Sequence, residues 1–201
     1  MKVLLIQAHP NEGSFSAAIA ARIRRGFEER EWITGPVEVI CHSLYQEEFY
    51  PVLPLEELKS RYSFDPVVQG YIDNVLRCDC MFFIHPDWWG QPPAILKGWL
   101  DRVFRPGVAY EYTGDEFEEK RHVPKLNGKK GCVIITTNLV YSEENQKYFE
   151  DLWIDKVFGF CGVEACGVEV YYDMHNSTFG DRTRWLENLA ISIPGLLDFE
   201  K

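Results

Sequence analysis

Five short apolar runs, separated by segments with helical spacing, constrain the fold of this chain more than any other feature. The runs lie at residues 2–8, 37–41, 78–84, 131–137 and 163–172. In other segments apolar side chains recur every three or four residues, which is the period of one helix face. Those segments are residues 15–27, 66–76, 93–103, 142–159 and 178–193. Strands alternating with helices predict an α/β fold with a doubly wound, five-stranded parallel sheet and helices on both faces.

Length and charge limit the organisation of the chain and its partners. Its 201 residues suffice for one well-buried domain and are short for two. No repeat or linker interrupts the pattern, so we expect a single domain over residues 1–201. The formal net charge of −10 argues against a nucleic-acid partner, because such proteins usually carry a basic face.

The apolar runs and the cysteines also bear on location. No run approaches the roughly 20 residues of a membrane span, and the N-terminal run is too short for a signal peptide. Six cysteines lie mostly in or beside apolar runs, with no CxxC pair and no nearby histidine that suggests zinc. We therefore expect buried thiols, no metal site, no membrane span and a cytoplasmic location.

Two long excursions interrupt the alternation, at residues 43–64 and 105–128. Loops of this length inside a compact domain are usually functional or disordered. The charged run at residues 115–121 is interpreted as a solvated loop tip. The tyrosines that precede it, Tyr110 and Tyr112, are expected to form a pocket wall or a subunit contact.

The loop after the first apolar run is a candidate phosphate site. Residues 9–16 lead into a helix, whose free N–H groups and positive dipole end suit an anion. Neither GxGxxG nor GxxxxGK[ST] is present, so His9, Ser14 and Ser16 would supply the side-chain donors. The alternative is that Asn11 or Ser14 only caps the helix, and the sequence does not separate the two.

The loops after the third and fourth runs complete a candidate site, because strands of a parallel sheet end at one edge. Adjacent Trp88 and Trp89 predict a platform for a flat ring, although packing in the core or at an interface is the alternative. Polar residues 136–141 would face the other side of the same ligand. A phosphate, a ring and polar contacts together describe a flavin nucleotide in a flavodoxin-like arrangement.

The motifs of these loops are specific. The stretch HPNEGSFS resembles the HPxxxSFN motif of the NAD(P)H:quinone oxidoreductase family. The stretch HPDWWGQPPAILKGWLDRVFRPGVAYEY resembles the central signature of that family, and its bacterial NAD(P)H oxidoreductase branch most of all. The likeness continues through residues 44–52 and 158–162. It implies a dimeric, flavodoxin-like flavoprotein that moves a hydride from NAD(P)H through its flavin to a quinone or similar acceptor.

The resemblance also implies a set of cofactor-binding residues. Those expected at the flavin phosphates are His9, Ser14, Phe15 and Ser16. Those expected at the isoalloxazine are Pro86, Asp87, Trp88 and Trp89, and at its other edge Thr136, Thr137, Asn138 and Leu139. The adenosine-binding region has no signature of its own. The long segment 43–64 and the first-loop histidine favour FAD, with FMN as the alternative.

Two departures from the family pattern affect the expected chemistry. The family's asparagine after Ser-Phe is Ser16 here, a shorter donor. The Thr-Thr-Gly-Gly loop of the animal members is Thr-Thr-Asn-Leu here, and Tyr141 is the only nearby tyrosine. We therefore assign no catalytic acid. His85 is interpreted as a packed side chain, and His42, His122 and His175 are scattered, suggest no metal cluster and are assigned no functional role.

Two other functions remain open at this stage. Some relatives in the family look like flavin-bound regulatory partners of membrane transport systems, and such a protein would turn over slowly. A one-electron, flavodoxin-type carrier is the third possibility. The bulky Trp88–Trp89 loop and the absence of a flavodoxin-style phosphate loop argue against the carrier.

Overall fold

The computed structural model describes residues 1–29, 35–114 and 120–197. Its main sheet has five strands in the spatial order β2-β1-β3-β6-β7, and every pairing is parallel. The strands are β1 (Lys2–Gln7), β2 (Glu38–Ser43), β3 (Cys80–Pro86), β6 (Lys130–Thr136) and β7 (Glu164–Tyr171). This order reverses direction between β1 and β3, as in flavodoxin-like sheets.

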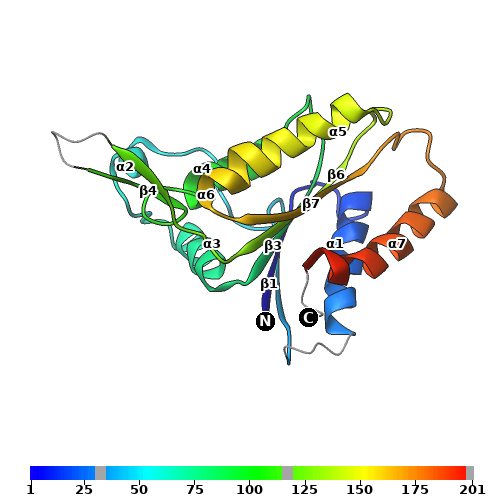
Figure 1. Cartoon of the computed structure of the whole chain (residues 1–201), viewed down its shortest axis with the longest axis horizontal. Coiled ribbons are helices and arrows are strands. Elements are labelled where there is room, and N and C mark those ends of the chain that lie inside the picture. The colour runs from blue at the N-terminus through cyan, green and yellow to red at the C-terminus, as the bar shows by residue number, and fades with distance from the viewer. Residues whose placement is uncertain (30–34, 115–119, 198–201) are drawn as a thin grey trace.

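Helices cover both faces of the sheet (Figure 1). One face carries α1 (Phe15–Glu28) and α7 (Phe179–Leu197). The other carries α3 (Pro66–Arg77), α4 (Ala94–Val103) and α5 (Glu143–Glu150). The helix expected over residues 142–159 is present, but α5 continues as a π-helix η1 (Asp151–Phe158) and a last turn α6 (Gly159–Cys161). The predicted doubly wound α/β fold is confirmed.

Side chains of each central strand alternate between two hydrophobic cores. Leu4 and Ile6 of β1 point into the core under α3, α4 and α5, whereas Val3 and Leu5 point into the core under α1 and α7. Such alternation follows from the two-residue period of a strand. Burial on both faces holds for β1, β3 and β6. It is incomplete for β2 and β7, because they are the edge strands.

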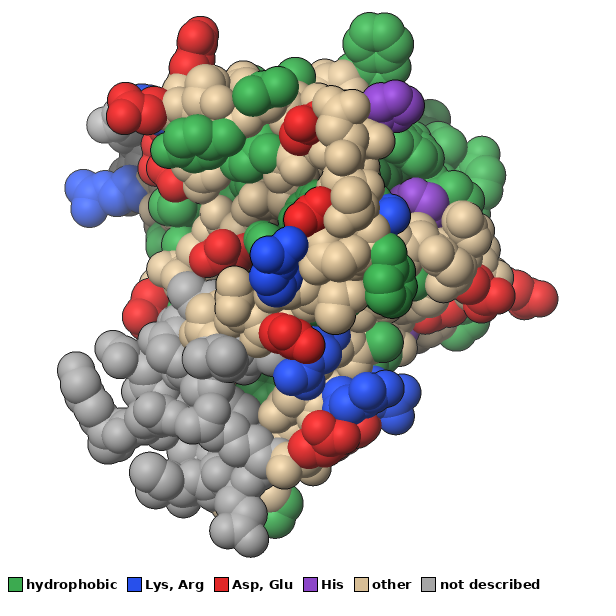
Figure 2. All heavy atoms as spheres, turned by 90° about the vertical axis from the view of Figure 1, so that its right-hand side faces the viewer, with side chains coloured by type: hydrophobic (Ala, Val, Ile, Leu, Met, Phe, Trp, Pro, Cys, Tyr) green, Lys and Arg blue, Asp and Glu red, His purple; other side chains and the backbone are tan. Residues whose placement is uncertain are grey.

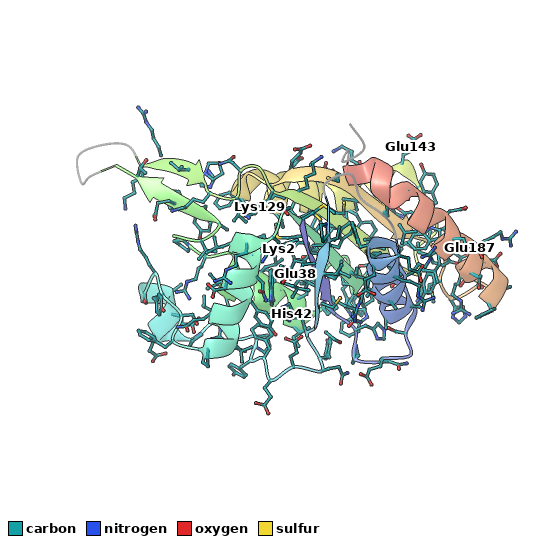
Figure 3. All side chains as sticks on the ribbon, turned by 90° about the horizontal axis from the view of Figure 1, so that it is seen from below. Lys2, Glu38, His42, Lys129, Glu143 and Glu187 are labelled. Atoms are coloured by element: carbon teal, nitrogen blue, oxygen red, sulfur yellow. The ribbon has the colours of Figure 1, made fainter. Side chains whose placement is uncertain are left out.

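The amino edge of the sheet is closed by interactions within the chain. Lys2 forms an ion pair with Glu38 at 3.0 Å, and its backbone N–H donates to Asp79 at 2.6 Å. Lys129 Nζ donates to the carbonyls of Leu76 and Cys78 at 2.8 and 2.7 Å. Figure 3 looks at this edge and shows Lys2, Glu38 and Lys129 close to one another, with Glu143 of α5 well to one side. These polar groups of the amino edge are thus engaged within the chain.

The two excursions carry structure of their own. The first contains the short helix α2 (Leu55–Lys59), and the second contains an antiparallel hairpin of β4 (Tyr110–Thr113) and β5 (Arg121–Pro124) that the sequence did not predict. The hairpin projects from the body of the molecule (Figure 1). Most of the predicted loop tip, residues 115–119, lies outside the described residues.

The cysteines are only partly as expected. All six are free, and Cys78, Cys80, Cys132 and Cys161 are buried. The prediction of a buried thiol is wrong for Cys41, which is exposed because β2 is an edge strand, and Cys166 is half-buried. Within the described part of the chain, no helix combines the length and apolarity that a membrane crossing requires.

Candidate active site

The loops after β1, β3 and β6 meet at the carboxyl edge, as the order of the strands requires. The Asp87 N–H donates to the Thr136 carbonyl at 2.8 Å, and the hydroxyls of Ser16 and Thr136 lie 3.4 Å apart. Together the loops line a cavity of about 190 Å³. Figure 2 shows hydrophobic side chains and histidines on the upper part of one face, with acidic side chains among them.

The cavity brings most of the predicted residues together. Nine of the twelve line it: His9, Phe15, Ser16, Pro86, Asp87, Trp88, Thr136, Thr137 and Asn138. The other three, Ser14, Trp89 and Leu139, lie in the same loops but not on its wall. Met174, which follows β7, also lines the cavity, and no local motif marked it in the sequence.

The first loop begins α1 with donors left open. Ser14 caps the helix, since its Oγ accepts from the Ala17 N–H at 3.1 Å, and its own hydroxyl hydrogen stays free to donate. Ser14 can therefore cap the helix and donate to a phosphate at the same time. The backbone N–H groups of Phe15 and Ser16 have no acceptor among the described residues. Unpaired N–H groups at a helix start, together with the helix dipole, favour an anion.

His9 is held as a neutral donor. Its Nδ1 accepts from the Asn11 N–H at 3.0 Å, which leaves the ring proton on Nε2. Burial is the largest influence on the His9 ring and lowers its pKa below 6.5. Asn11 in turn accepts from the Gly13 N–H at 2.9 Å, so the loop is braced by its own side chains.

Phe15 and Ser16 anchor the first loop to the sheet. The Phe15 ring packs edge-on against Tyr171 at 4.9 Å between centroids and against Trp185 of α7 at 5.9 Å. Ser16 is buried and its hydroxyl faces Thr136 of β6. The side chain of Phe15 thus acts in packing, and its backbone N–H is the part that faces open space.

Trp88 and Trp89 form a tight turn before α4. Trp88 and Gln91 exchange both backbone hydrogen bonds, at 2.9 and 3.2 Å. The two central residues have positive φ, 60° at Trp89 and 77° at Gly90, which defines a type I′ turn. Trp89 is fully exposed and Trp88 is 42% exposed. Packing of both rings in the core, the alternative that the sequence left open, is therefore wrong.

Asp87 links this turn to the loop after β6 by hydrogen bonds. One carboxylate oxygen accepts from the Gly90 N–H at 2.7 Å, and the other accepts from the Thr137 hydroxyl at 2.8 Å. Thr137 Oγ1 also accepts from the Leu139 N–H at 3.1 Å. The carboxylate of Asp87 is thus engaged within the protein, and the N–H groups of Trp89 and Asn138 have no acceptor among the described residues.

Tyr148 of α5 is a site residue that the sequence analysis missed. Its hydroxyl donates to the Gly90 carbonyl at 2.9 Å and accepts from Gln91 Nε2 at 2.8 Å. The contact joins residues nearly sixty positions apart, so no spacing pattern could reveal it. It links the turn to a third element of the carboxyl edge.

His85 has a structural role, as expected. It is buried at the end of β3, where Nδ1–H donates to the Pro86 carbonyl at 2.8 Å and the ring lies 5.3 Å from that of Trp153. Burial lowers the pKa of His85 to about 4, against the effect of the bond to Pro86, so the ring is neutral at pH 7. Across the described residues, no group of three or more His, Cys, Asp or Glu side chains is placed to hold a metal ion.

A larger cavity, about 580 Å³, lies between α2, α4 and η1. None of the twelve predicted residues lines it. Its wall includes the buried ion pair of Glu57 and Arg105 and the ring of Phe160. We place the site at the smaller cavity, because the open donors and the exposed tryptophans are there.

Comparison with known proteins defines the class. A family model described as a flavodoxin-like fold matches residues 1–188, and the chain belongs to this family. It is 33% identical over 187 residues to a protein of Haemophilus influenzae named an uncharacterized NAD(P)H oxidoreductase, covering 87% of this chain and 85% of the relative. It is 27% identical over 193 residues to an FMN-dependent NADH:quinone oxidoreductase of Macrococcus caseolyticus, covering 87% and 88%.

A solved structure gives the same architecture. The NAD(P)H:quinone oxidoreductase of Methanothermobacter marburgensis superposes with a TM-score of 0.75, covering 96% of this chain and 94% of that one at 24% identity. At this identity the likeness concerns the fold alone.

Proposed function

We propose that the protein is a flavin-dependent NAD(P)H oxidoreductase that passes two electrons to a quinone or a similar acceptor. The observation that carries the proposal is the convergence of three loops, each with a backbone N–H that has no acceptor among the described residues, beside two exposed tryptophans. The names of the relatives support the same activity. Bound flavin supplies the hydride chemistry, while the protein binds and orients it.

The open groups fit a flavin residue by residue. The N–H groups of Phe15 and Ser16, with His9 Nε2–H and the Ser14 hydroxyl, would hold a phosphate. Trp88 and Trp89 would lie against the isoalloxazine. The predicted Pro86, Asp87, Thr136 and Thr137 line the same space, and Asn138 with Leu139 would border the far edge of the ring.

The Asn138 N–H is the donor best suited to a negative charge on the reduced ring. It follows Thr137, whose backbone N–H is already used by the Tyr171 carbonyl at 2.9 Å. A fixed donor at the ring edge would stabilise the anionic reduced flavin without reorganisation during the reaction. We assign no side chain as proton donor.

FMN is the flavin that we propose. The relative from Macrococcus caseolyticus is named FMN-dependent, and the comparisons give no support for the FAD that the sequence favoured. The small cavity agrees with a compact ligand, although about 190 Å³ is below the roughly 300–1,000 Å³ of pockets that enclose small molecules. Most of the ring would therefore rest in an open groove against the tryptophans.

We propose that the protein acts as a homodimer in the cytoplasm. Six large apolar side chains are exposed on and around α2: Tyr50, Val52, Leu55, Leu58, Tyr62 and Phe64. An apolar patch of this kind usually marks an interface. Six free thiols fit a reducing compartment. Light scattering on the purified protein is expected to give twice the chain mass, and a stable monomer would contradict the dimer.

Flavin content is the direct test of the function. The purified protein is expected to be yellow, with FMN released on denaturation and identified by mass. Refilled protein is expected to oxidise NADH or NADPH when menadione is added. Slow turnover with a copurifying membrane partner would instead favour the regulatory alternative. A colourless protein that takes up neither FMN nor FAD would overturn the proposal.

A matched pair of variants tests the site. Trp89→Ala is expected to weaken FMN retention, because the exposed ring has no other partner. Phe179→Ala removes an equally exposed aromatic ring, 82% accessible, that lies outside the three loops, and is expected to leave retention unchanged. Equal retention in both variants would mean that Trp89 is no platform.

A further inference from the structure

The Trp88–Gln91 turn is strained at Trp89. A φ of 60° lies in the left-handed region, which is unfavourable for a residue other than glycine. The first central position of a type I′ turn usually holds Asn, Asp or Gly. The Trp89 ring is fully exposed, so packing within the chain does not offset the strain. Hydrogen bonds around the turn have to hold this conformation.

Two side chains hold the turn by hydrogen bonds to Gly90: Asp87, directly before the turn, and Tyr148 of α5. Asp87 accepts the Gly90 N–H, and Tyr148 donates to the carbonyl of the same Gly90. Tyr148 also accepts from Gln91 Nε2, so its single hydroxyl bridges two consecutive residues of the turn. A Cβ built on Gly90 would approach the Tyr148 hydroxyl to 3.1 Å, which shows how closely the tyrosine sits on the turn.

We infer that Tyr148 is a positioning residue for the flavin: by holding the Trp88–Gln91 turn in its strained form, it sets the place of the Trp89 ring and of the Trp89 N–H. This inference rests on the proposed function. Tyr148 needs no contact with the flavin, because it acts through the backbone of Gly90 and the side chain of Gln91. Without it, relaxation of Trp89 to negative φ would turn its ring and its N–H away from the ligand.

The variant Tyr148→Phe removes both hydrogen bonds and keeps the ring, which packs against Phe149 at 5.6 Å. We expect FMN binding, measured by flavin fluorescence, to weaken about fivefold to fiftyfold, the factor for one to two neutral hydrogen bonds. The visible circular dichroism of bound FMN is also expected to change, because the ring environment is altered. Tyr62→Phe is the control and is expected to leave FMN binding unchanged, since Tyr62 is exposed, lies outside the three loops and packs its ring on Phe64.

A double-mutant cycle separates positioning from general support of the fold. Glycine adopts positive φ without strain, so in a Trp89→Gly background the conformation of the turn depends less on the hydrogen bonds of the Tyr148 hydroxyl. We expect Tyr148→Phe to weaken FMN binding by less than about twofold in that background, because coupled residues give non-additive effects. An undiminished loss would overturn the inference and would indicate that Tyr148 contacts the flavin itself.

If Tyr148→Phe folds poorly, Gln91→Met is the second variant that tests the role of Tyr148. It removes one of the two bonds at the hydroxyl, and we expect about a threefold weakening of FMN binding with the same change in the dichroism. Wild-type protein that binds no flavin would overturn the proposed function. Wild-type protein that binds FMN, with a Tyr148→Phe variant of equal affinity and identical spectrum, would overturn only the role of Tyr148.

Discussion

Helix α4 begins and ends in opposite surroundings. Before its first residue, the Trp88–Gln91 turn is exposed, holds a strained backbone and includes the Trp89 N–H, which has no acceptor in the part of the chain that the structure describes. At its last turn, Arg102 and just beyond it Arg105 are buried, and both pair with Glu57 of α2. Arg102 lies 2.6 Å from one carboxylate oxygen and Arg105 lies 3.3 Å from the other.

The contrast separates polar groups that serve the fold from polar groups that serve a ligand. Around Glu57, the Ser63 hydroxyl also donates to the carboxylate, and Arg105 donates to two carbonyls of the α2 segment. These charges are shielded and paired. At the other end of α4 the strained backbone of the turn lowers the stability of the protein. Only binding of an external partner would offset this loss. Substitutions at the two ends should therefore change stability in opposite directions.

The largest effect is expected for Glu57→Ala. It removes the carboxylate that two buried guanidinium groups share and leaves Arg102 with Asp65 at 3.1 Å; loss of one member of a buried pair costs about 3–5 kcal/mol. Urea denaturation followed by circular dichroism measures the free energy of unfolding. The control is Glu56→Ala on the exposed side of α2, which we expect to change stability by less than about 0.5 kcal/mol. Equal losses in both variants would contradict a buried network.

Acid should act on the same cluster. Burial raises the pKa of Glu57, but hydrogen bonds from Arg102 and Ser63 and the two arginine charges hold it below its usual value. A lowered carboxyl pKa adds stability above the unfolded pKa of about 4.3, and this stability is lost as the pH falls through the folded pKa. Between about pH 5 and pH 3, unfolding free energy should therefore fall more steeply for wild type than for Glu57→Gln. Parallel curves would exclude Glu57 as a source of acid sensitivity.

The smallest effect, of opposite sign, is expected for Trp89→Gly. Relief of the left-handed strain should raise the stability of the flavin-free protein by about 1 kcal/mol, while FMN binding weakens. Phe179→Gly, which alters an equally exposed aromatic residue at the start of α7, should lower stability instead. If Trp89→Gly also lowers the free energy of unfolding, the positive φ of Trp89 does not reduce the stability of the wild-type protein.

Much of the fold was predictable because each buried strand is a continuous apolar run. At the start of α7, Thr178 and Asp181 bond reciprocally in the arrangement of a capping box. The β4–β5 hairpin was not predictable, since its strands have only four residues each and are separated by the charged run that was interpreted as a solvated loop tip. The π-helix η1 was hidden because its apolar spacing is that of an ordinary helix.

The candidate site was predictable in its loops but not in its contacts. The motif around Trp88 and Trp89 located the turn, and the order of the strands brought it to the other loops. Tyr148 and Met174 were missed because they join the site through folding across long distances in the chain. The engagement of the Asp87 carboxylate was missed for the same reason, since its partner Thr137 lies in the loop after another strand, β6.

The position of β1 in the middle of the sheet has a consequence for how the protein is made. Val3 pairs with Val39 on one side and with Cys80 on the other, 77 residues further along the chain. At a synthesis rate of roughly 5–20 residues per second, this second partner emerges about 4–15 s after β1. During that time β1, which is buried in the finished sheet, can pair at most with the edge strand β2. Yield in the cell will therefore depend on the protection of the growing chain as well as on the stability of the finished sheet.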